Sequence, residues 1–437
     1  MTSKPNILFV LADDLGWGDV SYHGSDIRTP NIDRLVRNGV ELDQHYVCPM
    51  CTPTRACFMT GRHPGRFGRH ATSPSNPPVL PDGYETIAAS LRNCGYDTGL
   101  FGKWHLGSAP EFCPNNYGFN ISHGSLAGGV DPYLHRYKEG EFSYTWHHDG
   151  ELINERGHVT DLIADQAVEF IETRESPWFC YVPFTAVHTP IKPPQEWVDT
   201  YEGQHWDDDP GCDHSFKLYA AYTSHMDHAV GRFIEALQRT CQVDNTIVVF
   251  TSDNGAIPAD NSGDTSKYPG RHEVLPRLGS NLPLRGRKAQ LYEGGVRTPS
   301  VVSWPGTLSP GARIDHPMHI VDWMPTFCGM LDYHPDNPQW DGTDIWPLLS
   351  GASDRLPDRP IFWNFRGMNY GVRYGQWKLT TNAAMEAGST ELFNIAEDEA
   401  EQNEISRQNE DVVSELTKII NEQRSLDDTS KRPDAPV

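Results

Sequence analysis

The fold is decided by the segment Asn6-Ile-Leu-Phe-Val-Leu-Ala-Asp13-Asp14, which joins a continuous apolar run to a pair of carboxylates. An unbroken apolar run of this length is typical of a strand that is buried on both faces of a sheet. Similar strand-like runs cover residues 98–101, 178–184 and 245–251. Helical periodicity covers residues 86–91, 161–171 and 216–240, and Thr160 is placed to cap the second of these helices.

This alternation of strands and helices predicts an α/β fold, with a large, mostly parallel central sheet flanked by helices. The pattern changes after residue 350: short strand-like segments begin at residues 360, 370 and 376, and a helix is expected over residues 412–421. We therefore predict a large α/β domain over residues 1–350 and a C-terminal subdomain over residues 351–437, built from a small antiparallel sheet and a terminal helix. The polar residues from 427 onward are expected to be frayed.

The charge balance limits the partners of this chain. Its 437 residues include 36 Lys and Arg against 59 Asp and Glu, which gives a formal net charge of −23. Binding to nucleic acid or to an anionic membrane surface normally requires a basic face, so neither partner is expected. The longest apolar run is far shorter than the roughly 20 residues that a membrane-spanning helix needs.

The N-terminus and the cysteines indicate the compartment. Residues 1–5 lead directly into the first strand without the regions of a signal peptide, so we expect a cytoplasmic chain, or a periplasmic or secreted one if a leader has been removed. Nine scattered cysteines are an odd number and do not resemble a disulfide framework.

Hard oxygen ligands follow two of the expected strands. Asp13 and Asp14 end the first strand, and Ser252-Asp253-Asn254-Gly255 ends the strand over residues 245–251. Open α/β sheets bind their ligands at the carboxyl ends of their strands, so these side chains are expected to converge. Three carboxylates and an amide, without clustered His or Cys, favour Ca²⁺ or Mg²⁺ over Zn²⁺.

A second motif is Cys48-Pro-Met-Cys51-Thr-Pro-Thr-Arg55-Ala-Cys57. A Cys-x-x-Cys pair can be a redox site or half of a zinc site, but the chain has no second pair to complete a Cys₄ site. Burial as ordinary core thiols would account for Cys48 and Cys57. It does not account for the spacing from Cys51 to Arg55.

Cys51-x-Pro53-x-Arg55 resembles the signature of the sulfatases, a family of the alkaline phosphatase superfamily in which this cysteine is converted to formylglycine. Five further segments resemble motifs of that family, in the same order along the chain. They are the segment from Asp13 to Asp19, Gly102-Lys103-Trp-His105-Leu-Gly107, Val187-His188-Thr-Pro190, Ser252-Asp253-Asn254-Gly255, and Arg287-Lys288 with the residues up to Pro299. The chain is thus identified as an arylsulfatase-like member, and residues 1–350 as its catalytic domain.

The resemblance assigns roles to the motif residues. It implies a cation, Ca²⁺ in preference to Mg²⁺, with the ligands Asp13, Asp14, modified Cys51, Asp253 and Asn254. It also implies a formylglycine-generating enzyme as a partner during maturation. The formylglycine hydrate attacks sulfur with one hydroxyl and releases sulfate by elimination from the other, so a serine would form the ester without releasing it.

The remaining motif residues are implied to act on the nucleophile or the sulfate. Arg55 would hold the nucleophile, Lys103 would bridge it to the sulfate, and His105 would deprotonate the second hydroxyl. His188 and Lys288 would bind sulfate and protonate the leaving oxygen. Independently, Lys103 and His105 are two residues apart, a spacing that would place them on one face of a strand.

The sequence therefore predicts a sulfuric ester hydrolase acting on a small sulfated substrate, and the resemblance to arylsulfatases and galactosamine-sulfate sulfatases implies that this substrate is a carbohydrate. Two alternatives remain: a phosphonate monoester or phosphodiester hydrolase with the same modified cysteine, and a non-catalytic sugar-sulfate binding protein. Asn254 and the Lys103/His105 pair favour sulfate. Residues 74–81, residues 253–284 and Trp363-Asn-Phe-Arg366 are candidate specificity walls, and Arg285 and Arg287 either touch substrate or lie on a loop surface.

Overall fold

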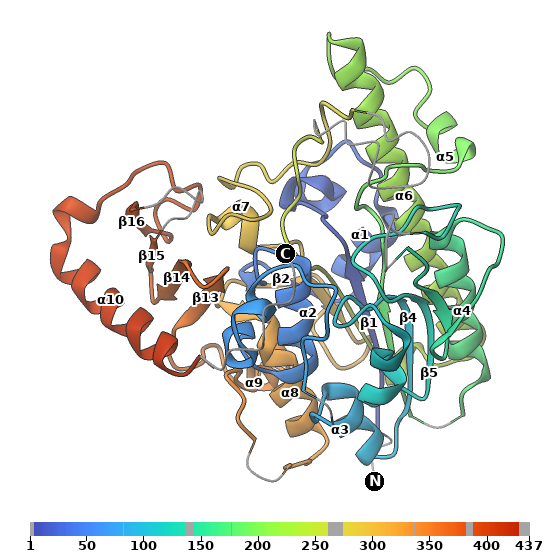
Figure 1. The fold of residues 1–437 in the computed structure, drawn as a ribbon, viewed down its shortest axis with the longest axis horizontal. Coiled ribbons are helices and arrows are strands. Elements are labelled where there is room, and N and C mark those ends of the chain that lie inside the picture. Colours follow the sequence, from blue (N-terminus) through green and yellow to red (C-terminus); the bar gives the residue numbers. More distant parts are fainter. Residues whose placement is uncertain are drawn as a thin grey trace.

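The computed structural model describes residues 4–81, 83–136, 143–175, 177–260, 274–335, 338–381 and 388–427. Within these residues, ten strands form one sheet in the order β11-β2-β10-β9-β1-β8-β4-β5-β6-β7. Figure 1 labels β1, β2, β4 and β5 of this sheet. Their bounds are β1 (Asn6–Ala12), β2 (Val40–Leu42), β4 (Asp97–Lys103), β5 (Ile121–Ser125), β6 (Trp146–His148), β7 (Glu151–Leu152), β8 (Trp178–Pro183), β9 (Thr246–Ser252), β10 (Val301–Ser303) and β11 (Ala312–Ile314).

The centre of the sheet is parallel. Strands β9, β1, β8, β4 and β5 pair in parallel with their neighbours, and β11 pairs in parallel with β2. The antiparallel pairs involve β10 on one side and β6 and β7 on the other. The predicted α/β class with a mostly parallel central sheet is therefore confirmed, with antiparallel strands added toward its edges.

Helices cover both faces of this sheet. The helices of the chain are α1 (Pro30–Arg37), α2 (Cys51–Thr60), α3 (Ile87–Asn93), α4 (Val159–Thr173), α5 (Gln195–Asp199), α6 (Pro210–Arg239), α7 (Glu293–Val296), α8 (Trp323–Met330), α9 (Trp346–Leu349) and α10 (Glu410–Ser425). No helix among the described residues is both long and apolar enough to span a bilayer.

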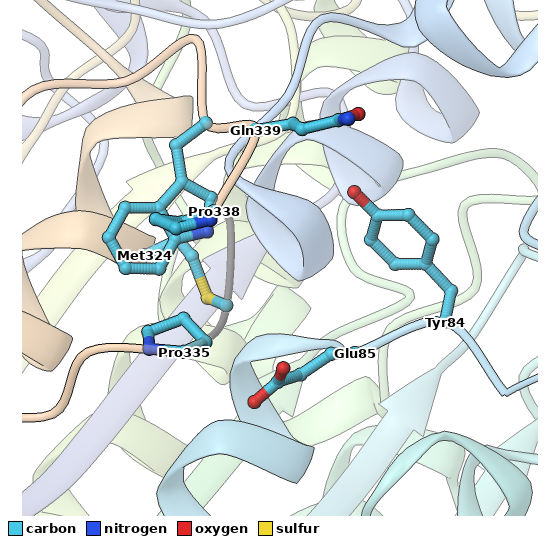
Figure 2. Close-up of a pocket in the computed structure, with 7 residues that line it drawn as sticks. Tyr84, Glu85, Met324, Pro335, Pro338 and Gln339 are labelled. Carbon is cyan, nitrogen blue, oxygen red and sulfur yellow. The ribbon is translucent and has the colours of Figure 1, made fainter.

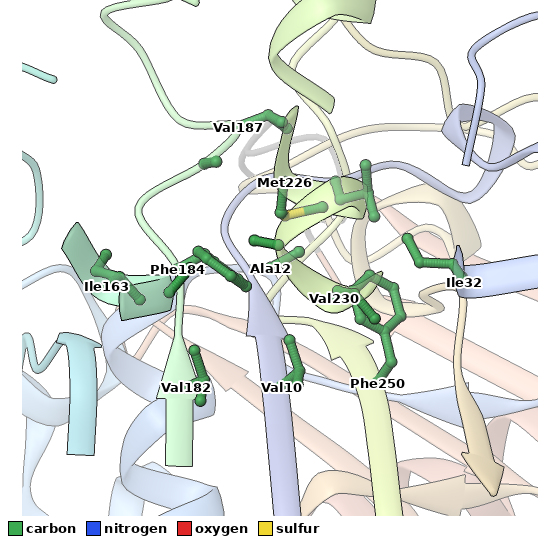
Figure 3. Close-up of a cluster of buried hydrophobic side chains, with 14 of the residues drawn as sticks. Val10, Ala12, Ile32, Ile163, Val182, Phe184, Val187, Met226, Val230 and Phe250 are labelled. Carbon is green, nitrogen blue, oxygen red and sulfur yellow. The ribbon is translucent and has the colours of Figure 1, made fainter. Parts of the chain in front are cut away.

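The apolar run of β1 explains this two-sided packing. Successive strand residues point to opposite faces, so Leu8, Val10 and Ala12 pack with α1, α4 and α6, as Figure 3 shows around Val10 and Ala12. Ile7, Phe9 and Leu11 lie in the opposite core, with side chains of α2, α3 and α8. All seven residues of β1 are buried, as predicted for a central strand.

Two predicted helix starts differ from the observed ones. Thr160 does not cap α4: the cap is His158, whose Nδ1 accepts a hydrogen bond from the backbone N–H of Thr160 at 3.1 Å. A neutral imidazole nitrogen can take the place of the usual hydroxyl or carboxylate at this position. α6 begins at Pro210 rather than near residue 216, because Asp209 accepts hydrogen bonds from the N–H groups of Gly211 and Cys212.

The C-terminal part contains a separate antiparallel sheet in the order β13-β14-β15-β16. Its strands are β13 (Ile361–Phe365), β14 (Asn369–Tyr374), β15 (Trp377–Thr381) and β16 (Thr390–Asn394), and the last of them was not predicted. A further short pair joins β3 (His45–Tyr46) to β12 (Met318–His319). The division of the chain at residue 350 stays a prediction, and the predicted frayed tail lies almost entirely outside the described residues.

The small sheet is packed on both faces. Phe362, Val372 and Leu379 lie against Leu416 and Ile420 of α10. The opposite face places Trp363 and Phe365 in a core with Tyr46, Leu291 and Val296 of the large part. The β13–β14 hairpin is therefore held against the segments that flank α2 and α7.

A buried ion cluster joins the small sheet to α7. Lys378 on β15 contacts Glu293 at 2.7 Å and Glu401 at 3.0 Å, and all three side chains are fully buried. Burial opposes ionisation of Glu293, but Lys378 and Arg297 outweigh it and lower its pKa. Burial raises the pKa of Glu401 to about 7.

The variant Lys378→Met is expected to lower the free energy of unfolding by about 3–5 kcal/mol, because it leaves buried carboxylates without their cation. The measurement is urea unfolding followed by circular dichroism. Lys418→Met is the matched control on the exposed face of α10, and a change below about 0.5 kcal/mol is expected there. Equal small effects of both substitutions would contradict the assigned role of Lys378.

Candidate active site

The candidate ligands meet because β1 and β9 are parallel neighbours. Ala12 pairs with Ser252, so Asp13–Asp14 and Asp253–Asn254 leave the sheet together. The backbone N–H of Asp253 donates to the carbonyl of Ala12 at 3.0 Å. That of Asp14 donates to Oδ1 of Asp253 at 3.3 Å, and Asp14 has a left-handed backbone with φ 64°. The sequence prediction of a convergent acidic cluster therefore matches the geometry.

Cys51 enters the site as the first residue of α2. The hydroxyl of Thr54 donates to the carbonyl of Asp253 at 2.7 Å and accepts the backbone N–H of Cys48 at 2.9 Å, which holds the start of α2 against the end of β9. Arg55 lies one helical turn after Cys51 and therefore on the same face. Sequence reasoning missed this role of Thr54, since its hydroxyl marks a helix start without identifying the carbonyl it would bind.

Three cations neutralise the carboxylates. Lys103 Nζ lies 2.5 Å from Oδ2 of Asp13, and Lys288 Nζ lies 2.6 Å from Oδ1 of Asp14. Arg55 donates through Nη2 to Oδ2 of Asp253 at 2.7 Å. Its Nη1 donates to the backbone carbonyl of Lys103 at 2.6 Å, which ties α2 to the end of β4.

Two buried oxygens in this cluster are left without a hydrogen-bond partner among the described residues. They are Oδ1 of Asp13 and Oδ1 of Asn254, whose Nδ2 donates to Asp14 at 2.7 Å. Asp13, Asp14 and His188 also present ligand atoms within 4.8 Å of one another. Unpaired buried oxygens are costly, and hard oxygens are the ligands of hard divalent cations, so these residues fit such an ion.

The carboxylates of the site differ in acidity. Burial, and then the neighbouring Asp253, raise the pKa of Asp13 to about 7. Burial opposes ionisation of Asp14, but the charge of Lys288 and the hydrogen bonds from Lys288 and Asn254 outweigh it and hold its pKa below the ordinary value. Burial also raises the pKa of the Cys51 thiol, so an unmodified Cys51 is a neutral thiol and a weak nucleophile.

Two neutral imidazoles complete the site. Burial, reinforced by Lys103 and Arg55, lowers the pKa of His105 well below its ordinary value. Burial, followed by the charge of Lys288, lowers that of His188 to about 3. The Nδ1 of His188 is 2.6 Å from the carbonyl of Thr189 and donates to it, since a carbonyl only accepts. Its Nε2 lies 3.9 Å from Oδ2 of Asp14.

Lys103 and His105 do not share one face of a strand, so this prediction is wrong. Lys103 is the last residue of β4, and His105 lies beyond it with a left-handed backbone, φ 57°. The chain still follows β5, because the N–H groups of Trp104 and His105 donate to the carbonyls of Ser125 and Leu126. The two side chains thus enter the site from a strand end and a loop, not from alternate positions of one strand.

The two arginines near Lys288 have different positions. Arg285 turns toward the C-terminal sheet, where it donates to the hydroxyl of Tyr292 at 3.1 Å and the carbonyl of Glu401 at 3.0 Å. It is therefore a structural contact and does not touch the acidic cluster. Arg287 is exposed on the loop surface beside Lys288.

A close backbone approach explains the glycine of the second acidic motif. A Cβ atom on Gly255 would lie 1.8 Å from the carbonyl oxygen of Gly294 in α7. The backbone N–H of Lys288 donates to the carbonyl of Ala256 at 3.2 Å. The glycine therefore lets the loop that carries Lys288 lie against the end of β9.

A surface pocket of about 190 Å³ lies elsewhere in the chain. Figure 2 shows Met324, Pro335 and Pro338 on one side of it and Tyr84 and Glu85 on the other. Gly61, which ends α2, packs on Met324 and Trp340 of this pocket, so the pocket is at the opposite end of α2 from Cys51. It contains no predicted site residue.

Comparison with known proteins gives the class. The sulfatase family model matches residues 5–333, and the chain belongs to the sulfatase family. Arylsulfatase J of Mus musculus is 32% identical over 407 residues, covering 88% of this chain and 63% of the mouse protein. N-acetylgalactosamine-6-sulfatase of Homo sapiens is 32% identical over 389 residues, covering 83% of this chain and 68% of the human protein. This chain thus spans less than two thirds of the length of arylsulfatase J.

A solved structure extends the likeness to the whole chain. The crystal structure of Ps i-CgsB in complex with k-i-k-neocarrahexaose superposes on this chain with a TM-score of 0.85, and the two sequences are 30% identical. The match covers 98% of this chain and 94% of that protein. The fold is therefore that of the sulfatases, including the small C-terminal sheet.

Addition of a hard divalent cation is expected to raise the stability of the protein, by about 2.7 kcal/mol at a hundredfold excess over Kd. The variant Asp14→Asn should lose this gain, because it removes an anionic ligand from the cluster. Thermal unfolding with Ca²⁺, with Mg²⁺ and with a chelator measures the effect. Asp332→Asn is the matched control, since Asp332 is exposed and also has a positive φ of 53°. An unchanged cation effect in Asp14→Asn would place the ion elsewhere.

Proposed function

We propose that this chain hydrolyses a sulfate ester on a carbohydrate, with a formylglycine at position 51 and a bound Ca²⁺. The observation that carries this proposal is the position of Cys51: it begins α2 beside three buried carboxylates, and Arg55, Lys103 and Lys288 reach the same cluster. Cleavage of a sulfate ester requires an oxygen nucleophile, neutralisation of the charge on the sulfate and a proton for the leaving oxygen.

The cation and the modified residue 51 would supply part of this chemistry. The cation would be held by Asp13, Asp14, Asp253 and Asn254 together with residue 51, and it supplies positive charge beside the sulfate. The formylglycine, as its hydrate, supplies the attacking oxygen and a second hydroxyl that permits release of sulfate by elimination. A formylglycine-generating enzyme is the partner that this modification requires.

The roles of the protein's own side chains follow from their contacts. Arg55 and Lys103 present fixed N–H donors next to residue 51, where they orient the nucleophile and the sulfate oxygens. His105 is neutral, with Nδ1 lacking a partner among the described residues, and can accept the proton of the second hydroxyl.

The leaving oxygen needs a proton donor. In neutral His188 the proton is on Nδ1, which donates to Thr189, so Nε2 presents a lone pair. Of the two residues proposed to bind sulfate and protonate the leaving oxygen, Lys288 is therefore the one that carries a proton in this arrangement. His188 would contribute a proton only in its charged form.

The carbohydrate substrate class is supported by the names of similar proteins. One curated relative is named for N-acetylgalactosamine 6-sulfate, and the similar solved structure holds a neocarrahexaose. A sulfated carbohydrate is the class against which the enzyme should first be assayed.

Mass spectrometry of the peptide that contains Cys51, from the native host, is expected to find an aldehyde where the sequence encodes a thiol. The variant Cys51→Ser should release at most one equivalent of alcohol per enzyme and retain sulfate on that peptide. Cys241→Ser removes an exposed thiol and should keep full turnover. Multiple turnover by Cys51→Ser would contradict the elimination step.

Kinetics on an aryl sulfate and on an aryl phosphonate monoester separate the two hydrolase candidates. We expect a higher kcat/KM for the sulfate. The variant Lys288→Ala should lose most of this kcat/KM even when it still binds the cation and still contains the modified residue 51. Turnover of the phosphonate alone would establish the alternative hydrolase. Binding of sulfated sugar by fully modified protein without turnover of either ester would indicate a binding protein.

A further inference from the structure

Two exposed arginines lie together beside the start of α2. Arg69 is in the 3₁₀ turn Arg69–Thr72, and Arg366 is in the turn between β13 and β14. Nε of Arg69 donates to the backbone carbonyl of Arg366 at 3.0 Å, and the N–H of Arg366 donates to the carbonyl of Thr72 at 3.1 Å. We call this pair the arginine rim.

The arginine rim is connected to the candidate active site through short contacts. A few residues after Thr72, the N–H of Ser75 donates to the hydroxyl of Thr52 at 3.2 Å, directly after Cys51. On the other side, Phe365 packs in one core with Met50 and Ala289, the neighbours of Cys51 and Lys288. The rim therefore borders the place where the segments carrying Cys51 and Lys288 meet.

The arginine rim has no carboxylate partner among the described residues. Among the residues that the structure describes, neither Arg69 nor Arg366 forms an ion pair with a carboxylate. Arg66, three residues before Arg69, is buried and paired with Asp341 at 3.1 Å and with Asp427 at 2.5 Å. In a chain with a net charge of −23, two exposed arginines on contacting turns, without carboxylate partners among the described residues, give this part of the surface a positive charge.

The turn that carries Arg366 is hydrogen-bonded and unusual in sequence. Arg366 and Gly367 both have positive φ, at 58° and 64°, a conformation for which Asn-Gly or Asp-Gly is the favoured pair. Gly367 is held by hydrogen bonds from its N–H to Asn364 Oδ1 and from the Tyr370 hydroxyl to its carbonyl. A long cationic side chain in a left-handed position costs local stability, which is typical of a functional position.

We propose that the arginine rim binds a second anionic substituent, a sulfate or a carboxylate, on the carbohydrate whose scissile sulfate lies at Cys51. This inference rests on the proposed function and assigns a subsite to it. Guanidinium groups suit the assignment because they bind sulfate and carboxylate oxygens in a forked geometry. Lys103, Lys288 and His188 already face the acidic cluster, so the rim is available for a different group.

The test uses the fully modified, Ca²⁺-loaded enzyme and the variants Arg366→Asn, Arg69→Gln and their combination. Asn suits the left-handed turn position, so Arg366→Asn is expected to fold normally. Arg355→Gln is the matched control, since Arg355 is an exposed arginine paired with Asp358 away from the rim. The substrates are an aryl sulfate, a monosulfated disaccharide, a disulfated disaccharide and a monosulfated disaccharide that contains a uronic acid.

The double variant is expected to lose roughly tenfold in kcat/KM on the substrates with a second anion, and to stay within about twofold of wild type on the aryl sulfate and the monosulfated sugar. A loss confined to the disulfated or to the uronic acid substrate identifies the bound group. The proposal would be overturned if the ratio of kcat/KM between double variant and wild type were the same for all four substrates.

Calorimetric binding of the same disaccharides keeps this test separate from that of the proposed function. If the wild type hydrolyses no sulfate ester but binds the doubly charged sugars more tightly than the double variant, the proposed function fails and the rim stands. If aryl sulfate is hydrolysed while the variants bind every sugar like wild type, the proposed function stands and the rim fails.

Discussion

The rest of the site depends on buried ion pairs between carboxylates and cations at the carboxyl ends of the central strands. Asp13, Asp14 and Asp253 are almost fully excluded from solvent, and each faces a cation from a different part of the chain. Removing one partner of such a pair is strongly destabilising, because the other charge stays buried. The ends of β1, β4 and β9, the start of α2 and the loop before α7 are therefore fixed relative to one another by charge.

Much of this arrangement could be predicted from residue patterns. Continuous apolar runs identify β1, β8 and β9. Because Asp13–Asp14 and Asp253–Asn254 follow two such strands, their side chains could be predicted to lie close together. The strands β6 and β7, at one end of the sheet, escaped prediction because they are short and contain His and Glu. The order of strands depends on packing between distant segments, which no local pattern encodes.

The site residues divide in the same way. Cys51 and Arg55 share a helix face, so their spacing carries geometric information. His105 and Lys288 lie on loops without periodicity, and their positions depend on backbone hydrogen bonds to Leu126 and Ala256. A strongly acidic composition also gave no indication of the cations that gather at Asp13, Asp14 and Asp253. Net charge averages over the whole surface, while a binding site depends on the nearest few groups.

The burial of Cys51 has a consequence for the timing of maturation. The side chain is 3% exposed and forms the first turn of a helix whose ten residues are all buried. If Cys51 is converted to formylglycine as proposed, the modifying enzyme would need access to a thiol that the docked helix covers. Conversion would then have to precede the packing of α2 onto the sheet, and a molecule that folded first would keep its thiol. The ratio of folding rate to modification rate would set the active fraction.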